Sequence, residues 1–178
     1  MKKAIVIVLL SLISILTAFA QDKHDRMFLA LINEYRTSKG LNPVEYDPML
    51  DSAAKVQSSW MQKFEKIDHN IGVHSRLEMI DPLYRDKVRQ YSIVENCYGD
   101  MHSNGFISGV NSVVDDDVLC AFVGWKNSPG HNMAMLIPET TSIGFDIRGC
   151  VMDNGIGYLI VATMVAGTKT GSPVTNVE

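Results

Sequence analysis

The segment from Tyr158 to Val165 is the feature that most limits how this chain can fold. It reads YLIVATMV, with apolar side chains at both odd and even positions. Since successive side chains of a β-strand point to opposite faces of the sheet, both faces of this strand must be covered. We therefore predict that the strand lies at the centre of a sheet, with helices on each side.

Two further strands are expected. Ile143, Phe145 and Ile147 alternate with small or polar residues, and the turn-forming run 153–155 separates them from the central strand, which predicts a β-hairpin. A shorter strand is expected from Tyr91 to Cys97. The polar stretch 99–111 contains glycines, and we expect it to be an exposed loop.

Helices are predicted for most of the remaining chain. Apolar residues recur at helical spacing in the segments 27–39, 48–64 and 115–127, and shorter helices are expected at 74–80 and 131–136. The first helix should end at Gly40, and the second should begin at Asp47 followed by Pro48. Their expected apolar faces comprise Met27, Phe28, Leu31, Ile32 and Tyr35; Leu50, Ala53, Ala54, Gln57, Trp60, Met61 and Phe64; and Val114, Val118, Ala121, Phe122 and Trp125.

The order of these elements indicates the fold class. Helices come first, mixed elements follow, and a hairpin ends the chain. This order favours a three-layer α/β/α sandwich with a small, largely antiparallel sheet over a doubly wound parallel sheet.

The first twenty residues have the pattern of a signal peptide. Lys2 and Lys3 precede an apolar run, and Ala18 and Ala20 form a small-x-small cleavage pattern. The run is shorter than the roughly 20 apolar residues of a membrane-spanning helix. We therefore expect cleavage after residue 20, a mature domain at 21–178 with no integral membrane segment, and a secreted or periplasmic protein.

Charge and cysteine content narrow the possibilities further. The formal net charge is −4 and no block of Lys or Arg occurs, which argues against nucleic-acid binding and against polybasic attraction to membranes. Of Cys97, Cys120 and Cys150, one pair could form a disulfide in an oxidising compartment, and the sequence leaves the pairing open. Cys120 lies within a predicted helix, where we expect it to be buried as a small apolar residue.

Two segments carry candidate functional groups. In the run from Trp125 to His131, a helix ends and Pro129–Gly130 forces a turn, so His131 should project from a rigid corner. Glu95 follows the apolar pair 93–94, and a partly buried carboxylate there would need a histidine or a metal ion as partner. The alternatives are that His131 caps the turn or packs on Trp125, and that Glu95 is an exposed residue at a strand end.

These segments together resemble the CAP superfamily, which includes cysteine-rich secretory proteins, insect venom antigens and plant pathogenesis-related proteins, in its bacterial SCP-like extracellular form. The resemblance covers roughly residues 27–165. It rests on Leu31–Arg36, which is similar to the family's opening helix, and on Trp125–His131, which is similar to the Trp-x-x-Ser-Pro-Gly-His signature. Glu95–Asn96 resembles a Gly-Glu-Asn motif, with Val94 in place of the usual glycine.

The resemblance implies a cleft with two histidines and usually two acidic residues. The first histidine corresponds to His69, with His74 as a rival, and the second to His131. Glu95 corresponds to the first acid, and Ser128 stands where eukaryotic relatives have the second. The residues expected at the binding cleft are therefore His69, His74, Glu95, Asn96, Trp125, Ser128 and His131.

His69, Glu95 and His131 are a sufficient set for a divalent metal such as zinc with one open coordination position. They are equally sufficient for a metal-free network in which Glu95 orients an imidazole.

Three functions remain open. The resemblance favours a secreted binding module for a lipid, peptide or glycan, because eukaryotic relatives are associated with sterol and lipid binding. A metal-assisted hydrolase acting on peptide or cell-envelope material is the alternative, but the sequence has no HExxH motif and no clear nucleophile–base pair. The third reading is a structural extracellular domain with a vestigial cleft.

Overall fold

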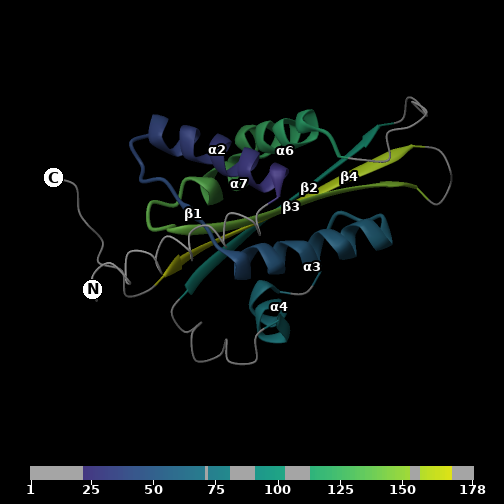
Figure 1. The fold of residues 1–178 in the computed structure, drawn as a ribbon, viewed down its shortest axis with the longest axis horizontal. Coiled ribbons are helices and arrows are strands. Elements are labelled where there is room, and N and C mark those ends of the chain that lie inside the picture. Colours follow the sequence, from purple (N-terminus) through teal and green to yellow (C-terminus); the bar gives the residue numbers. More distant parts are fainter. Residues whose placement is uncertain (1–21, 71, 81–90, 103–112, 153–156, 170–178) are drawn as a thin grey trace, which may run out of the picture.

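A four-stranded sheet forms the middle layer of the structure, a computed structural model that describes residues 22–70, 72–80, 91–102, 113–152 and 157–169. The strands are β1 (Glu45–Tyr46), β2 (Tyr91–His102), β3 (Ser142–Val151) and β4 (Tyr158–Lys169), in the spatial order β1-β3-β4-β2 (Figure 1). β4 is antiparallel to both β2 and β3, whereas β1 is parallel to β3. The predicted signal peptide and the predicted turn at 153–155 lie outside the described residues.

Helices cover both faces of this sheet. One layer contains α2 (Lys23–Ser38), α6 (Asp115–Asn127) and α7 (Pro129–Met135), and the other contains α3 (Pro48–Phe64) and α4 (Val73–Ile80) (Figure 1). The prediction of a three-layer α/β/α sandwich with a largely antiparallel sheet is confirmed. None of the helices in the described part of the chain combines the length and the apolar character needed to cross a membrane.

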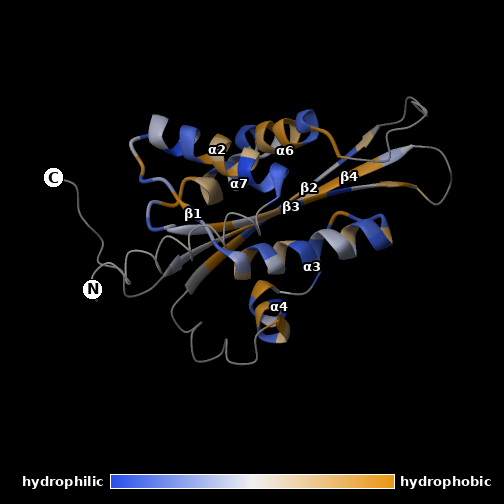
Figure 2. Ribbon diagram, in the orientation of Figure 1, coloured by the Kyte–Doolittle hydropathy of each residue, from blue (hydrophilic) through white to orange (hydrophobic). Residues whose placement is uncertain are grey.

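The central strand explains why both layers form. Hydrophobic residues follow β4 along much of its length (Figure 2). Ile160, Ala162 and Met164 pack into the core beneath α2 and α6, while the alternate residues Val161 and Val165 pack against α3. The prediction that this strand is buried on both faces is confirmed.

The helix ends follow the predicted signals. Asp47 caps α3 by accepting a hydrogen bond from the Met49 amide at 2.8 Å, with Pro48 at the first helical position. After α2, Gly40 adopts φ +75°, a left-handed conformation that glycine tolerates without steric cost. The amide of Leu41 then donates to the carbonyl of Arg36 at 3.0 Å, which closes the helix end.

Arg36 shows that the buried face of α2 differs from the predicted one. Phe28, Ile32 and Arg36 are fully buried, whereas the predicted Leu31 and Tyr35 are only half-buried. The Arg36 guanidinium donates to four backbone carbonyls, at Asn42, Met135, Ile137 and Thr140. These contacts satisfy the buried charge and fasten α2 to the chain that links α7 to β3.

Four other predictions need correction. Phe64 is 54% exposed, because it is the last residue of α3, where its ring lies at a tilt against Trp60. Val114 is exposed at the N-cap of α6, and Cys120 is exposed on the outer face of that helix, since only the face with Val118, Ala121, Phe122 and Trp125 meets the sheet. The segment 99–102 is strand, because β2 pairs with β4 as far as His102. The rest of the predicted loop lies outside the described residues.

Asp25 gives the fold a pH dependence that can be measured. Its side chain is buried at the start of α2, and burial, with the charges of Asp51 and Asp22, raises the pKa of this carboxyl from 3.8 to about 7. In the unfolded chain the carboxyl ionises near its ordinary value. Its stabilising contribution is therefore complete below about pH 4 and is lost as the pH rises towards 7.

We expect Asp25→Asn to raise the free energy of unfolding by about 1–3 kcal/mol at pH 8 and to change it little at pH 4. The asparagine carbonyl can still accept the hydrogen bond from the Asp22 amide. Urea denaturation at both pH values measures the difference. Glu34→Gln, an exposed substitution on the same helix, is the control, and an equal pH-dependent gain in that variant would contradict the role given to Asp25.

Candidate functional site

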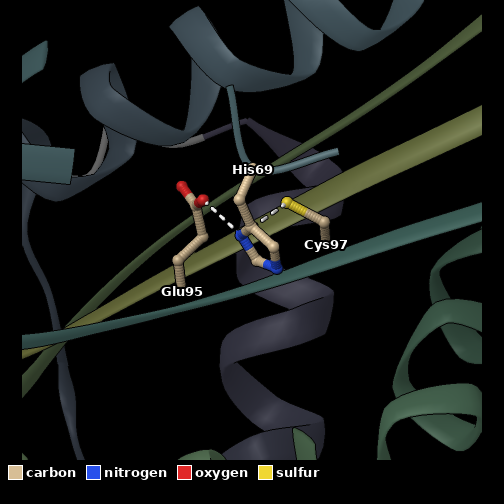
Figure 3. A group of neighbouring side chains, drawn as sticks. All are labelled: His69, Glu95 and Cys97. Atoms are coloured by element: carbon tan, nitrogen blue, oxygen red, sulfur yellow. Dashed lines mark hydrogen bonds and ion pairs between the residues drawn. The ribbon is translucent and has the colours of Figure 1, made fainter. Parts of the chain in front are cut away.

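The candidate site lies on β2, which is an edge strand of the sheet. Glu95 and Cys97 are two residues apart on this strand, so their side chains share the face that α3 and α4 cover. His69 reaches them from the segment between α3 and α4 (Figure 3). Two segments that are distant in sequence therefore converge at one edge of the sheet.

A nearly buried carboxylate forms the centre of the site. Oε1 of Glu95 lies 2.8 Å from Nδ1 of His69, and Oε2 accepts a hydrogen bond from Nη2 of Arg76. The Glu95 side chain is 7% exposed and that of Arg76 is 1% exposed, whereas that of His69 is 58% exposed. Burial lowers the pKa of the Arg76 guanidinium to about 10, so it stays charged at neutral pH. A buried ion pair thus holds an imidazole that solvent can reach.

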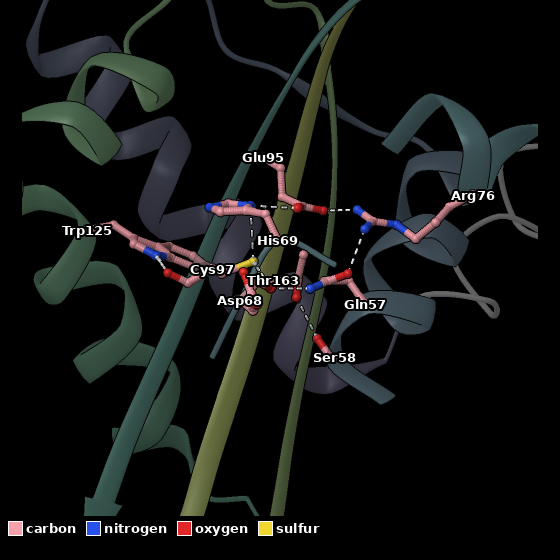
Figure 4. A network of polar contacts seen from close by, with 9 residues as sticks. All are labelled: Gln57, Ser58, Asp68, His69, Arg76, Glu95, Cys97, Trp125 and Thr163. Carbon is pink, nitrogen blue, oxygen red and sulfur yellow. Dashed lines mark hydrogen bonds and ion pairs between the residues drawn. The ribbon is translucent and has the colours of Figure 1, made fainter. Parts of the chain in front are cut away.

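Gln57 on α3 positions both partners of this carboxylate. Its Oε1 accepts a hydrogen bond from Nη1 of Arg76 at 2.6 Å, and its Nε2 donates to the backbone carbonyl of Asp68 (Figure 4). Asp68 immediately precedes His69 in the chain. One buried amide therefore fixes both the guanidinium and the segment that carries the imidazole.

Cys97 is the residue of this group that sequence reasoning missed. Its Sγ lies 3.7 Å from Nδ1 of His69 and 3.7 Å from the carbonyl oxygen of Asp68. Burial raises the pKa of the Cys97 thiol to about 11, so the sulfur carries its proton at neutral pH. The alternation of a β-strand was the available signal, because it places position 97 on the same face as Glu95.

The cysteines are unpaired in the structure. Cys97 lies on β2 and Cys150 on β3, and β4 separates these strands. Since neighbouring strands are about 4.8 Å apart, the two Cα atoms are farther apart than a disulfide allows. Cys120 lies on the other side of the sheet, on the outer face of α6.

His131 approaches the same strand from the other helical layer. It lies on α7, and its Nδ1 is 3.0 Å from Oγ of Ser128. Its backbone carbonyl accepts a hydrogen bond from Nδ2 of Asn96 at 3.0 Å. Burial and, secondarily, the charge of His69 lower the pKa of His131.

The other two predicted site residues have different positions. Trp125 is 1% exposed, and its Nε1 donates to the carbonyl of Cys97 at 3.0 Å, so it anchors α6 on the edge of β2. His74 is exposed on α4, and none of the contacts between described residues joins it to Glu95. Of the two rival histidines, the structure brings His69 to the carboxylate.

The fold and the site together define a class of protein: an α/β/α sandwich in which a carboxylate on an edge strand pairs with a histidine from the segment between two helices. The family model of CAP, the cysteine-rich secretory protein family, matches residues 29–163. The match covers more than half of the chain, and the chain therefore belongs to the CAP family. No curated protein has a significant match to it.

Solved structures agree at the level of the fold. An outer surface protein from Borrelia burgdorferi is 18% identical, with a TM-score of 0.54 over 81% of this chain and 91% of that one. An extracellular protein containing an SCP domain, from Bacillus anthracis, is 20% identical, with a TM-score of 0.53 over 80% of this chain. The match spans 40% of that longer protein. At such identities the likeness supports the shared architecture and nothing finer.

The Arg76–Glu95 pair generates a stability prediction. We expect Arg76→Met to lower the free energy of unfolding by about 3–5 kcal/mol, because it leaves a buried carboxylate without its counter-charge. Adding Glu95→Gln to the same chain should recover part of this loss. Chemical denaturation of the single and double variants gives the coupling directly.

Lys66→Met is the control, because Lys66 forms an ion pair with Asp68 in which both side chains are exposed. Such pairs contribute about 1 kcal/mol or less. A loss in Arg76→Met no larger than in this control would show that the Arg76–Glu95 pair does not hold the site together.

Proposed function

We propose that the protein is a secreted CAP-domain binding module, and that the edge of β2 around His69, Glu95 and His131 binds a lipid, peptide or glycan. The observation that carries the proposal is the contrast in exposure between His69 and the two residues that support it, Glu95 and Arg76. A solvent-exposed imidazole is held at 2.8 Å by a carboxylate that is itself fixed by a buried arginine. Rigid support behind an exposed polar group is the arrangement that a recognition site needs.

Apolar side chains flank the two imidazoles along the chain. Ile67, two residues before His69, is 49% exposed, and Met133, two residues after His131, is 69% exposed. An imidazole can donate to a carboxylate, phosphate or hydroxyl oxygen, and Ile67 and Met133 can contact apolar parts of the same ligand. This mixture supports an amphipathic ligand class. The predicted signal peptide and the two neighbours named as outer-surface and extracellular proteins support secretion.

Hydrolysis is the alternative, and the geometry gives it less support. In a Cys–His–acid triad, the nucleophile and the acid contact different ring nitrogens. Here Cys97 and Glu95 both lie against Nδ1 of His69. Ser128 is within hydrogen-bonding distance of His131, but among the described residues no carboxylate forms a hydrogen bond or ion pair with that imidazole to orient it. Binding therefore accounts for more of the observed contacts than catalysis does.

A ligand panel tests the binding proposal. The probes are a monomeric lysophospholipid, an unstructured peptide and a cell-wall oligosaccharide, each titrated into isotope-labelled protein and followed by NMR. We expect one class to shift resonances of His69, His131 and their neighbours. His69→Ala and His131→Ala should each weaken that binding by about tenfold, the equivalent of roughly 1.4 kcal/mol for one lost polar contact.

His74→Ala is the matched control, since it removes an exposed histidine from the nearby helix α4. The proposal is wrong if no class binds, if the shifts map to another surface, or if His74→Ala weakens binding as much as the two cleft variants do. Hydrolysis of any probe that stops in Glu95→Gln would favour the enzyme instead.

A further inference from the structure

We propose that His69, Glu95 and Cys97 form a binding site for a borderline-soft divalent cation of the zinc type, with Cys97 as its sulfur ligand. The predicted metal set was His69, Glu95 and His131, so the inference replaces the second imidazole with a thiolate. It shares two residues with the proposed ligand cleft, but it does not require that an organic ligand binds there.

The distances between donor atoms suit a single ion. Nδ1 of His69, a carboxylate oxygen of Glu95 and Sγ of Cys97 all lie within 4.8 Å of one another. Tetrahedral zinc with ordinary bond lengths separates its nitrogen, oxygen and sulfur ligands by about 3.4–3.6 Å. The Nδ1–Sγ distance of 3.7 Å is already close to this value, and the Nδ1–Oε1 distance of 2.8 Å would have to open by about half an ångström.

The types of donor indicate which ion would bind. A set of one nitrogen, one oxygen and one sulfur ligand suits zinc, cadmium or cobalt, whereas magnesium and calcium prefer oxygen ligands throughout. Three protein ligands leave a fourth position for water or another small ligand. Of these ligands, His69 is the solvent-exposed one, with 58% of its side chain accessible, against 7% for Glu95.

Residues around the three ligands hold them in place. Arg76 occupies Oε2 of Glu95 and leaves Oε1 for the cation, so the carboxylate would bind through one oxygen. Gln57 fixes the Asp68 carbonyl, which lies 3.7 Å from the thiol. Such outer contacts orient the ligands of metal sites. The carboxylate and a thiolate carry two negative charges against one on Arg76, which leaves the site net negative towards a cation.

Binding of the cation requires a change of protonation at both His69 and Cys97. In the metal-free protein, Nδ1 of His69 carries the proton that faces Oε1 of Glu95, and Sγ of Cys97 carries the thiol proton. On binding, the imidazole proton moves to Nε2 through solvent, and the thiol proton is released. Bonds then form from the cation to Nδ1, Oε1 and Sγ. One proton leaves per ion bound, and nothing is oxidised or reduced.

Cadmium and zinc titrations test the inference directly. We expect one cadmium ion per chain to produce the ultraviolet charge-transfer band of a cadmium–thiolate bond. Cys97→Ser should abolish this band and weaken zinc binding at least about tenfold, measured by equilibrium dialysis. Cys120→Ser, at the exposed cysteine on α6, and Cys150→Ser, on β3, should leave both unchanged. Magnesium should not compete.

A second variant keeps the inference testable if Cys97→Ser does not fold. His69→Gln keeps an N–H that can donate to Oε1 of Glu95, so it should fold with a Tm close to the native value while losing zinc affinity to a similar extent. The inference is overturned if saturating cadmium gives no thiolate band, or if the band survives in Cys97→Ser. Zinc binding that is lost in His131→Ala and kept in Cys97→Ser would assign the metal to the two imidazoles. It would also overturn the sulfur site, while leaving the ligand panel as a separate test of the binding module.

Discussion

The buried pair of Arg76 and Glu95 is the interaction on which the rest of the site depends. Removing both charges from water is costly, and their attraction offsets this cost only when further polar contacts complete the arrangement. Gln57 and His69 supply those contacts, at 2.6 Å from the guanidinium and 2.8 Å from the carboxylate. The pair therefore joins α3, α4, β2 and the segment before α4 into one unit. Displacing α4 or β2 would separate the two buried charges, and displacing Gln57 or His69 would remove a polar contact that supports them.

The position of Glu95 on an edge strand explains why both helical layers contribute to one site. An edge strand has backbone groups that no neighbouring strand satisfies. Trp125 of α6 donates to the carbonyl of Cys97, and Asn96 on the same strand reaches the carbonyl of His131 on α7. The layer of α2, α6 and α7 is thus attached to β2 at the Asn96 side chain and the Cys97 carbonyl. The side chains of Glu95 and Cys97 lie on the opposite face of the strand. These contacts satisfy one carbonyl of the edge strand and hold the α7 segment that carries His131 beside β2.

The sequence could predict the layers but only part of the site, and the difference has a physical basis. Burial of β4 on both faces follows from local alternation, which needs no knowledge of partners. The roles of Gln57, Arg36 and Cys97 depend on which distant segments lie opposite them. Gln57 falls on the apolar face predicted for its helix, and Arg36 falls outside the apolar face predicted for the first helix. Spacing alone could not choose between His69 and His74, because the choice depends on the path of the chain between α3 and α4.

His69 can take part in both the proposed ligand site and the proposed cation site because it has two ring nitrogens. Nδ1 makes the contacts with both Glu95 and Cys97, while the other nitrogen contacts neither of them (Figure 3). In the metal-free protein, a proton on Nδ1 leaves Nε2 as an acceptor. With a cation on Nδ1, the proton lies on Nε2, which becomes a donor. The inner partners of His69 therefore determine which hydrogen bond it offers outward. In this way a cation held in part by the buried Cys97 would decide whether the exposed His69 donates or accepts a hydrogen bond through Nε2.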